Sequence, residues 1–132
     1  MRDPRPGLAW SKRRVRRRAA YAAWMASDEW LARRSAWREA WVAAHGEEPH
    51  CVVCGGPWNL RHGDLHHRSY AHLGAERDCD LIPLDRACHD RLHAILESTP
   101  AWGRLGRAHS TDVIVARLRR AWTSREGRAD GR

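Results

Sequence analysis

Residues 51–93 read CVVCGGPWNLRHGDLHHRSYAHLGAERDCDLIPLDRACHDRLH. This segment contains all 4 cysteines of the chain and most of its 9 histidines, and His50 stands directly before it. Cysteine and histidine are the side chains that most often bind zinc and related metals. Their concentration in one short segment predicts that the fold is organised around bound metal.

The histidines of this segment include an adjacent doublet and a spaced pair. His66 and His67 form the doublet, and His89 precedes His93 by one helical turn. Residues i and i+4 of a helix lie on one face, so the spaced pair is close enough to share one ion. Imidazole also accepts protons near neutral pH, because its ordinary pKa is about 6.5. The pattern therefore predicts a histidine site with metal-binding and proton-transfer capacity.

The first cysteine pair has the form of a metal knuckle. Cys51-x2-Cys54 is followed by two glycines, which permit the tight turn that aims both sulfurs at one ion. The sequence has no apolar run of about 18 residues that would span a membrane. Its basic N-terminus lacks the apolar stretch of a signal peptide. We therefore expect a cytoplasmic protein in which this pair binds metal rather than forming a disulfide.

Periodicity and capping residues predict the elements around the central segment. Ser27 is a suitable N-cap and Gly46 a suitable helix end. The predicted elements are helices over residues 11–26 and 28–44, strands over 65–70 and 81–84, a helix from 85 or 86 to about 97, and a last helix over 111–124. Pro100 and Gly103 are expected to break the helix that runs to about residue 97, and residues 1–11 are expected to be disordered.

The predicted helices have apolar faces. We expect the tryptophan stripe of the second helix to be core rather than a platform for nucleic-acid bases. The residues expected to be buried are Trp30, Trp37, Trp41 and Ala44 in the second helix, Cys88, Leu92, Ile95 and Leu96 in the next, and Ile114, Leu118, Ala121 and Trp122 in the last. The arginines expected to turn away from the second helix's core are Arg33, Arg34 and Arg38.

Charge is distributed unevenly along the chain. Residues 1–50 and 99–132 each have a formal net charge of +5, whereas residues 51–98 have −2, which together give the +8 of the whole chain. Basic ends on both sides of a metal-ligand segment favour a polyanionic partner. The residues expected to contact nucleic acid are Arg13, Arg14, Arg16, Arg17, Arg18, Arg117, Arg119 and Arg120.

The order of hairpin, helix and histidines resembles the HNH endonuclease family over about residues 51–93. The upstream pattern Tyr21-x2-Trp24-x2-Ser27-x2-Trp30 is similar to the leader helices of phage-type members. The resemblance implies an α+β, mostly helical fold with a zinc-knuckled ββα-metal core between N-terminal and C-terminal helices. It also implies a metal-dependent enzyme that hydrolyses phosphodiester bonds of DNA, with double-stranded DNA as the expected substrate.

The same resemblance implies roles for individual residues. His67 would be the general base, and Asp80 falls in a position that the family usually gives to Asn. A catalytic Mg²⁺, Mn²⁺, Ni²⁺ or Zn²⁺ would be held by His66, His89 and His93. An ionised Asp only accepts hydrogen bonds, whereas Asn also donates them, so the sequence leaves the effect of Asp80 on activity open.

The resemblance also implies a structural zinc, with one departure from the family pattern. The second knuckle is usually Cys-x2-Cys, but here Asp85 takes the place of its first cysteine, three residues before Cys88. Cys51, Cys54 and Cys88 would then need a fourth ligand. Asp85 keeps the spacing and offers a carboxylate oxygen, whereas Cys79 is the softer ligand but lies across the second predicted strand. The sequence slightly favours Asp85.

These observations predict a basic arm, disordered or helical, over residues 1–20, leader helices over 21–50 and a nuclease core over 51–98. A helical extension over 99–126 and a disordered tail over 127–132 complete the expected organisation. The alternative function is a zinc-stabilised nucleic-acid-binding module with a degenerate catalytic centre. A phage or mobile-element protein would suit the resemblance as a partner, and the sequence leaves the oligomeric state open.

Overall fold

The computed structural model describes the backbone of residues 6–130 and the side chains of residues 15–126. It confirms an α+β fold that is mostly helical, with one two-stranded antiparallel sheet. The elements are α1 (Pro6–Met25), α2 (Asp28–His45), β1 (Asp64–His67), the 3-10 turn η1 (Asp78–Asp80), β2 (Leu81–Leu84), α3 (Arg86–Leu96), α4 (Pro100–Arg104) and α5 (Arg107–Asp130). Among the described helices, none combines the length and the apolar content needed to cross a membrane.

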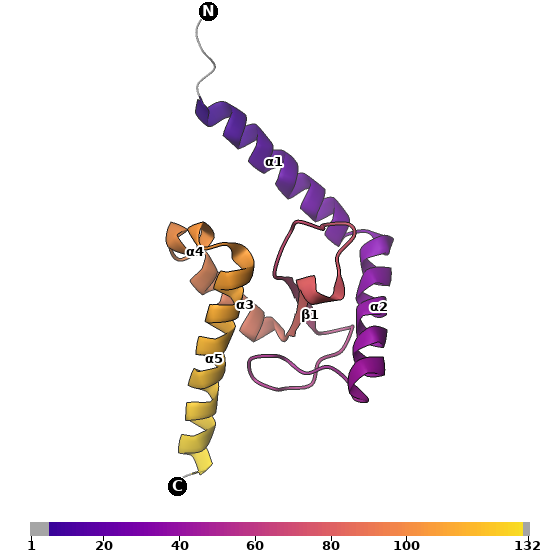
Figure 1. The fold of residues 1–132 in the computed structure, drawn as a ribbon, viewed down its shortest axis with the longest axis vertical. Coiled ribbons are helices and arrows are strands. Elements are labelled where there is room, and N and C mark those ends of the chain that lie inside the picture. Colours follow the sequence, from indigo (N-terminus) through magenta and orange to yellow (C-terminus); the bar gives the residue numbers. More distant parts are fainter. Residues whose placement is uncertain (1–5, 131–132) are drawn as a thin grey trace, which may run out of the picture.

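Local capping sets the boundary between the first two helices. The Ser27 hydroxyl accepts a hydrogen bond from the Trp30 backbone N–H at 3.1 Å and donates one to the Trp24 carbonyl at 2.6 Å. Gly46 ends α2 in the left-handed conformation, with φ of 73°, and its N–H donates to the Val42 carbonyl. Both caps were predicted. The bend at Ser27 directs α1 away from the body of the molecule, whereas α2 packs against that body (Figure 1).

The hairpin pairs β1 with β2 in antiparallel register, with Leu65 opposite Pro83 and His66 opposite Ile82. Successive strand residues point to opposite faces of a sheet. His66 therefore points toward α3 and α5, whereas His67 points toward the tryptophans of α2. The predicted strand over residues 65–70 is shorter in the structure, because the chain turns into the loop over 68–80 after His67.

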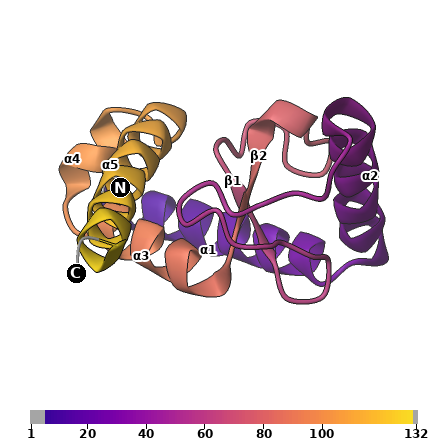
Figure 2. The ribbon, with the colours of Figure 1, turned by 90° about the horizontal axis from the view of Figure 1, so that it is seen from below.

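The hairpin lies between α2 on one side and α3 and α5 on the other (Figure 2). A hydrophobic cluster fills each side. The indole cluster on the α2 side consists of Trp30, Trp37, Trp58, Leu65 and Leu81. The aliphatic cluster toward α3 and α5 consists of Cys51, Val53, Leu84, Cys88, Leu92 and Ile114. Trp30 and Trp37 are each only 3% exposed. The tryptophan stripe is core, as predicted.

Two predictions about the face of α2 are wrong. Arg33 and Arg34 do not turn away from the core: Arg33 Nε donates to the Glu76 carbonyl at 2.8 Å, and Arg34 Nη2 donates to the Gly63 carbonyl at 2.7 Å. The reason is their spacing, since residues three and four positions after Trp30 share its helix face. Ala44 is exposed, because α2 extends past the hairpin at its C-terminal end.

The C-terminal region also departs from the prediction. Helix α3 ends at Leu96, before Pro100, as predicted. Pro100 then begins a further helix, α4, which also contains Gly103, because proline suits the first turn of a helix and Thr99 caps it. The last helix is longer than predicted, and it includes residues 127–130 of the expected tail. Ile114 is fully buried as predicted, but Ala121 is exposed. Proline at the N-terminus also explains why α1 begins at Pro6, within the expected lead.

Gly63 provides a stability test of the entry into β1. A Cβ atom at this position would lie 2.2 Å from Trp58 Nε1, which donates to the Asp64 carbonyl at 2.8 Å. Gly63→Ala should therefore displace the indole and lower the free energy of unfolding by about 1–3 kcal/mol. Urea denaturation measures this. Gly103→Ala is the matched control, since nothing lies within 4 Å of its added Cβ; an equal loss in both variants would contradict the steric explanation.

Candidate metal centres

Three imidazoles converge between β1 and α3. His66 Nδ1 lies 3.4 Å from His89 Nε2, and His93 Nε2 lies 3.0 Å from the same atom. A tetrahedral ion with metal–nitrogen distances of about 2.0–2.1 Å separates its nitrogen ligands by roughly 3.3 Å. The three ring nitrogens thus have the mutual spacing of ligands around one ion. The group can hold a metal ion.

The outward-facing nitrogen of each imidazole has a partner of its own. The three pairs are His66 Nε2 with Thr111 Oγ1 at 3.0 Å, His89 Nδ1 with Asp64 Oδ2 at 3.0 Å, and His93 Nδ1 with Glu97 Oε1 at 3.4 Å. Such partners fix the ring orientation and the tautomer of metal-binding histidines. The arrangement commits the inner nitrogen of each ring to the centre of the group.

The protonation state of this group also suits a metal. Burial, with the neighbouring positive charge of Arg107, lowers the pKa of His66 to about 2. Burial and the adjacent His89 lower the pKa of His93. Neutral imidazole is the form that coordinates metal. No protons therefore need to be displaced from these two rings at neutral pH.

The second group combines three sulfurs and one carboxylate. Cys51, Cys54, Asp85 and Cys88 place their ligand atoms within 4.8 Å of one another, and this group can hold a metal ion. Cys79 is exposed and lies outside the group. The geometry thus supports Asp85 over Cys79 as the fourth ligand. All four cysteines are free thiols.

Asp85 serves both the cysteine group and α3. One carboxylate oxygen lies 2.9 Å from Cys54 Sγ, and the other accepts a hydrogen bond from the Cys88 N–H at 2.7 Å as the N-cap of α3. Burial and then the Asp85 carboxylate raise the pKa of Cys54 to about 11, and the same two causes raise the pKa of Cys88. A cation bound among these groups would instead lower the pKa values of the thiols, because a coordinating thiol loses its proton.

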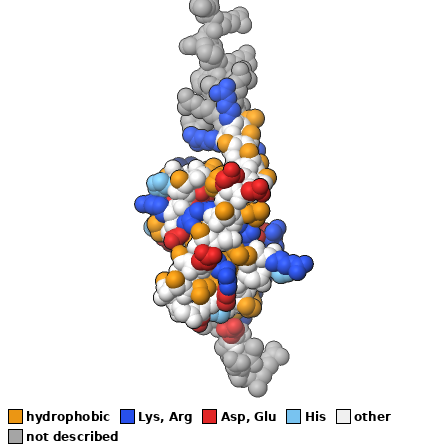
Figure 3. All heavy atoms as spheres, turned by 90° about the vertical axis from the view of Figure 1, so that its right-hand side faces the viewer, with side chains coloured by type: hydrophobic (Ala, Val, Ile, Leu, Met, Phe, Trp, Pro, Cys, Tyr) orange, Lys and Arg blue, Asp and Glu red, His pale blue; other side chains and the backbone are white. Residues whose placement is uncertain are grey.

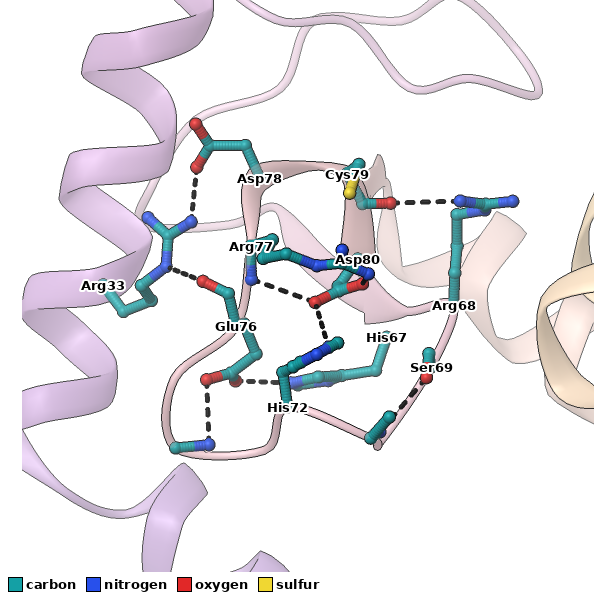
Figure 4. Close-up of polar contacts among 12 residues, drawn as sticks. Arg33, His67, Arg68, Ser69, His72, Glu76, Arg77, Asp78, Cys79 and Asp80 are labelled. Atoms are coloured by element: carbon teal, nitrogen blue, oxygen red, sulfur yellow. Dashed lines mark hydrogen bonds and ion pairs between the residues drawn. The ribbon is translucent and has the colours of Figure 1, made fainter.

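His67 lies on the opposite face of β1 from the histidine group. Its ring stacks on Trp30 at 5.1 Å between centroids, and Nε2 lies 2.7 Å from Glu76 Oε2. Glu76 also accepts hydrogen bonds from Trp24 Nε1 at 2.9 Å and from the Gly74 N–H at 3.0 Å. Figure 4 shows Glu76 reaching His67 across the loop. Burial lowers the pKa of His67, and the hydrogen bond to Glu76 opposes that effect.

Asp80 fixes the loop that carries Glu76. Its carboxylate accepts hydrogen bonds from the Arg77 N–H at 2.9 Å and from Arg77 Nη2 at 3.4 Å, and it lies 3.3 Å from His72 Nδ1 (Figure 4). Although burial raises its pKa, these donors lower the pKa of Asp80 overall. An ionised carboxylate only accepts hydrogen bonds, and its neighbours here are hydrogen-bond donors. Asp80 is thus suited to this loop in a way that Asn is not.

Asp80→Asn should consequently destabilise the loop. The amide keeps an acceptor for the Arg77 N–H, but it loses the charge and turns an N–H₂ toward other donors. We expect a loss of about 1.5–3 kcal/mol in unfolding free energy, the usual range for a hydrogen bond to a charged group. Thermal denaturation measures it, with Asp90→Asn on the exposed surface of α3 as the control. An unchanged melting temperature would contradict this assignment.

The predicted nucleic-acid contacts do not form one patch. Arg16, Arg17 and Arg18 are exposed on α1, and Arg117, Arg119 and Arg120 are exposed on α5. These helices project from opposite ends of the molecule (Figure 1). In Figure 3 basic side chains project from the part of α1 that borders the grey atoms, and both signs mix over the body. The side chains of residues 13 and 14 lie outside the described part of the chain.

Sequence reasoning missed several residues of these centres. Asp64 had a usable signal, because it precedes His66 by two residues and so faces the same side of the strand. Glu76, Thr111 and Arg107 had none, since loop conformation and the packing of α5 bring them to the histidines.

The chain was compared with protein families, with curated proteins and with solved structures. No family model, curated protein or solved structure matches it.

Proposed function

We propose that the protein is a metal-dependent endonuclease of the HNH type, which hydrolyses phosphodiester bonds of DNA. The observation that carries the proposal is the convergence of His66, His89 and His93, with their outer nitrogens partnered, on the strand that also holds His67. The order of β1, β2 and α3 around these residues supports a ββα-metal core.

The donor set fits a catalytic divalent ion. Three imidazoles occupy only part of the coordination shell, as in catalytic sites that keep positions open for substrate. A divalent ion held there would polarise the phosphate and stabilise negative charge on the leaving oxygen. Asp64 and Thr111 contribute by fixing the orientation of His89 and His66.

His67 and Glu76 are arranged for proton transfer. If the Glu76 carboxylate accepts the Nε2–H, the lone pair of the neutral His67 ring is on Nδ1, which would take the proton from water. The lowered pKa of His67 keeps the ring neutral at pH 7. Glu76 also stabilises the imidazolium that forms when the proton is taken, as the carboxylate of a catalytic triad does.

A cavity of about 410 Å³ offers the substrate a route to the histidine group. Its lining residues are Met25, Trp30, Arg34, Asp64, Leu65, Arg86, His89, Asp90 and His93. Arg86 pairs with Asp64 through Nε at 2.9 Å, so the acidic partner of His89 is itself held in place. Two arginines at this cavity suit the approach of a phosphate.

We assign the cysteine group to a structural Zn²⁺. Sulfur ligands favour zinc over the harder magnesium and calcium ions. Four protein ligands close the coordination shell, which is the pattern of structural sites. The ion would join the turn at Cys51 to the start of α3.

A plasmid assay tests the proposal. Zinc-loaded protein should nick or linearise supercoiled plasmid when Mg²⁺, Mn²⁺, Ni²⁺ or Zn²⁺ is added, and chelator should stop the reaction. His89→Ala should abolish cleavage, and excess metal should restore part of it. The matched control is His62→Ala, because His62 is exposed and belongs to neither group. Metal-independent cleavage, or cleavage unaffected by His89→Ala, would contradict the assignment of the ion site.

A zinc-stabilised DNA-binding module without catalysis is the second candidate. The observation that favours it is the burial of His67, which is only 2% exposed. A ring so enclosed by Trp30 and Glu76 also suits a purely structural role. Protein that binds plasmid but cuts it with none of the four metals would support this candidate over the nuclease.

A further inference from the structure

Arg107 begins α5 and lies between the histidine group and the loop after β1. Its Nε donates to the His67 carbonyl at 2.7 Å, and its guanidinium carbon lies 4.2 Å above the centre of the Tyr70 ring. Its positive charge lowers the pKa values of His66, His67 and His93. Arg107 is thus close to the predicted base and to two predicted metal ligands at once.

This arginine has no acidic partner within the described part of the chain. None of the ion pairs there includes Arg107. It is also partly buried, and this burial lowers its pKa. A partly buried charge without a counter-charge is costly. An anion bound here would offset that cost.

An aromatic cavity is lined by Tyr70, the ring over which the Arg107 guanidinium lies. We call it the tyrosine pocket; its volume is about 650 Å³, and it is lined by Arg17, Arg18, Ala20, Tyr21, Tyr70 and Leu73. The Tyr21 and Tyr70 rings meet edge to face at 5.5 Å, and Tyr70 is 42% exposed. Cavities of this size bind small organic ligands. The pocket combines exposed aromatic surface with two cationic side chains.

We propose that the tyrosine pocket and Arg107 bind one unpaired nucleotide of the substrate strand beside the histidine group, with the base against the part of Tyr70 that is exposed in the pocket and a phosphate on Arg107. The pairing of aromatic rings with arginines is the chemistry by which proteins hold unstacked bases. A base inside a duplex has both faces covered, so only an unpaired nucleotide can stack on Tyr70. The inference rests on the proposed function for its role, but binding itself can be measured separately.

The test uses a short single-stranded DNA with one central 2-aminopurine, whose fluorescence falls when it stacks. Titration with wild-type protein, without added catalytic metal, should quench the probe. Tyr70→Ala should weaken binding by about tenfold to a hundredfold and remove the quenching. Tyr70→Phe keeps the ring and should behave like the wild type. The same probe annealed into a duplex should show little quenching.

The phosphate contact is tested at Arg107. Arg107→Gln can still donate to the His67 carbonyl but lacks the charge, so affinity should fall by about tenfold or more. Arg107→Lys keeps the charge without the planar stacking group and should lose less affinity than Arg107→Gln. Arg91→Gln, on an exposed arginine of α3, is the control and should bind like the wild type.

Three outcomes would overturn the proposal. Tyr70→Ala and Arg107→Gln could both bind the probe like the wild type. Arg107→Gln could lower the melting temperature while the affinity of the folded protein for the probe stays unchanged. Arg107 would then have only a structural role at the end of β1. The duplex probe could bind and quench as the single strand does. By contrast, quenching that depends on both residues in a protein that cuts no plasmid would reject the nuclease and retain the nucleotide site.

Discussion

Cys88→Ser should leave the protein without the zinc that we propose for the cysteine group, and largely unfolded at 37 °C. A structural zinc contributes on the order of 10 kcal/mol to the folding of a small domain, which is comparable to the whole stability of most proteins. Cys88 is 2% exposed and belongs to both the cysteine group and the aliphatic cluster. Metal analysis of the purified protein and circular dichroism on heating measure the two losses.

Two companion variants make this prediction specific. Cys79→Ser alters an exposed thiol outside the group, so zinc content and melting temperature should stay at wild-type values. Asp85→Asn keeps a good N-cap for α3 but removes the anionic ligand. It should therefore lose zinc affinity without losing the helix start. Full zinc occupancy in Cys88→Ser would show that the four side chains do not share an ion.

His67→Ala should lower plasmid cleavage by about 10² to 10⁴, the usual contribution of a general base. His67 is not one of the three residues of the histidine group, so the metal content of the variant should stay close to that of the wild type. Because the ring is buried against Trp30, the variant will also lose some stability. Cleavage must therefore be measured well below its melting temperature, with metal analysis on the same sample.

Glu76→Gln separates orientation from proton transfer. The amide oxygen can still accept the Nε2–H of His67, but the charge that stabilises the imidazolium is gone. Cleavage should fall by less than in His67→Ala, and adding Glu76→Gln to His67→Ala should cause little further loss, because the two residues act as one unit. Additive losses would show that Glu76 acts elsewhere.

The sequence predicted the parts of the fold that depend on local chemistry. The caps at Ser27 and Gly46, the spacing of His89 and His93, and the cysteine turn each involve neighbours within a few residues. Such interactions are largely set by backbone geometry, so residue type and spacing are enough to predict them.

The parts that could not be predicted depend on distant packing. Glu76 reaches His67 only because the loop over residues 68–80 is held by Asp80 and by Arg33 of α2. Arg107 reaches His67 only because α5 packs against α3. Many loop conformations satisfy the same sequence pattern, and the choice among them is made by contacts that span dozens of residues.

The adjacent positions of Cys88 and His89 on α3 connect the two metal groups. Cys88 belongs to the cysteine group and His89 to the histidine group. Ordering this one helical turn therefore positions a ligand of each group. Binding of the first ion would include the loss of conformational entropy on ordering the turn. The second ion would then bind more tightly, because the turn is already ordered. Such coupling is reciprocal. Zinc removal should therefore weaken the affinity of the histidine group for its own ion, although no atom is shared between them.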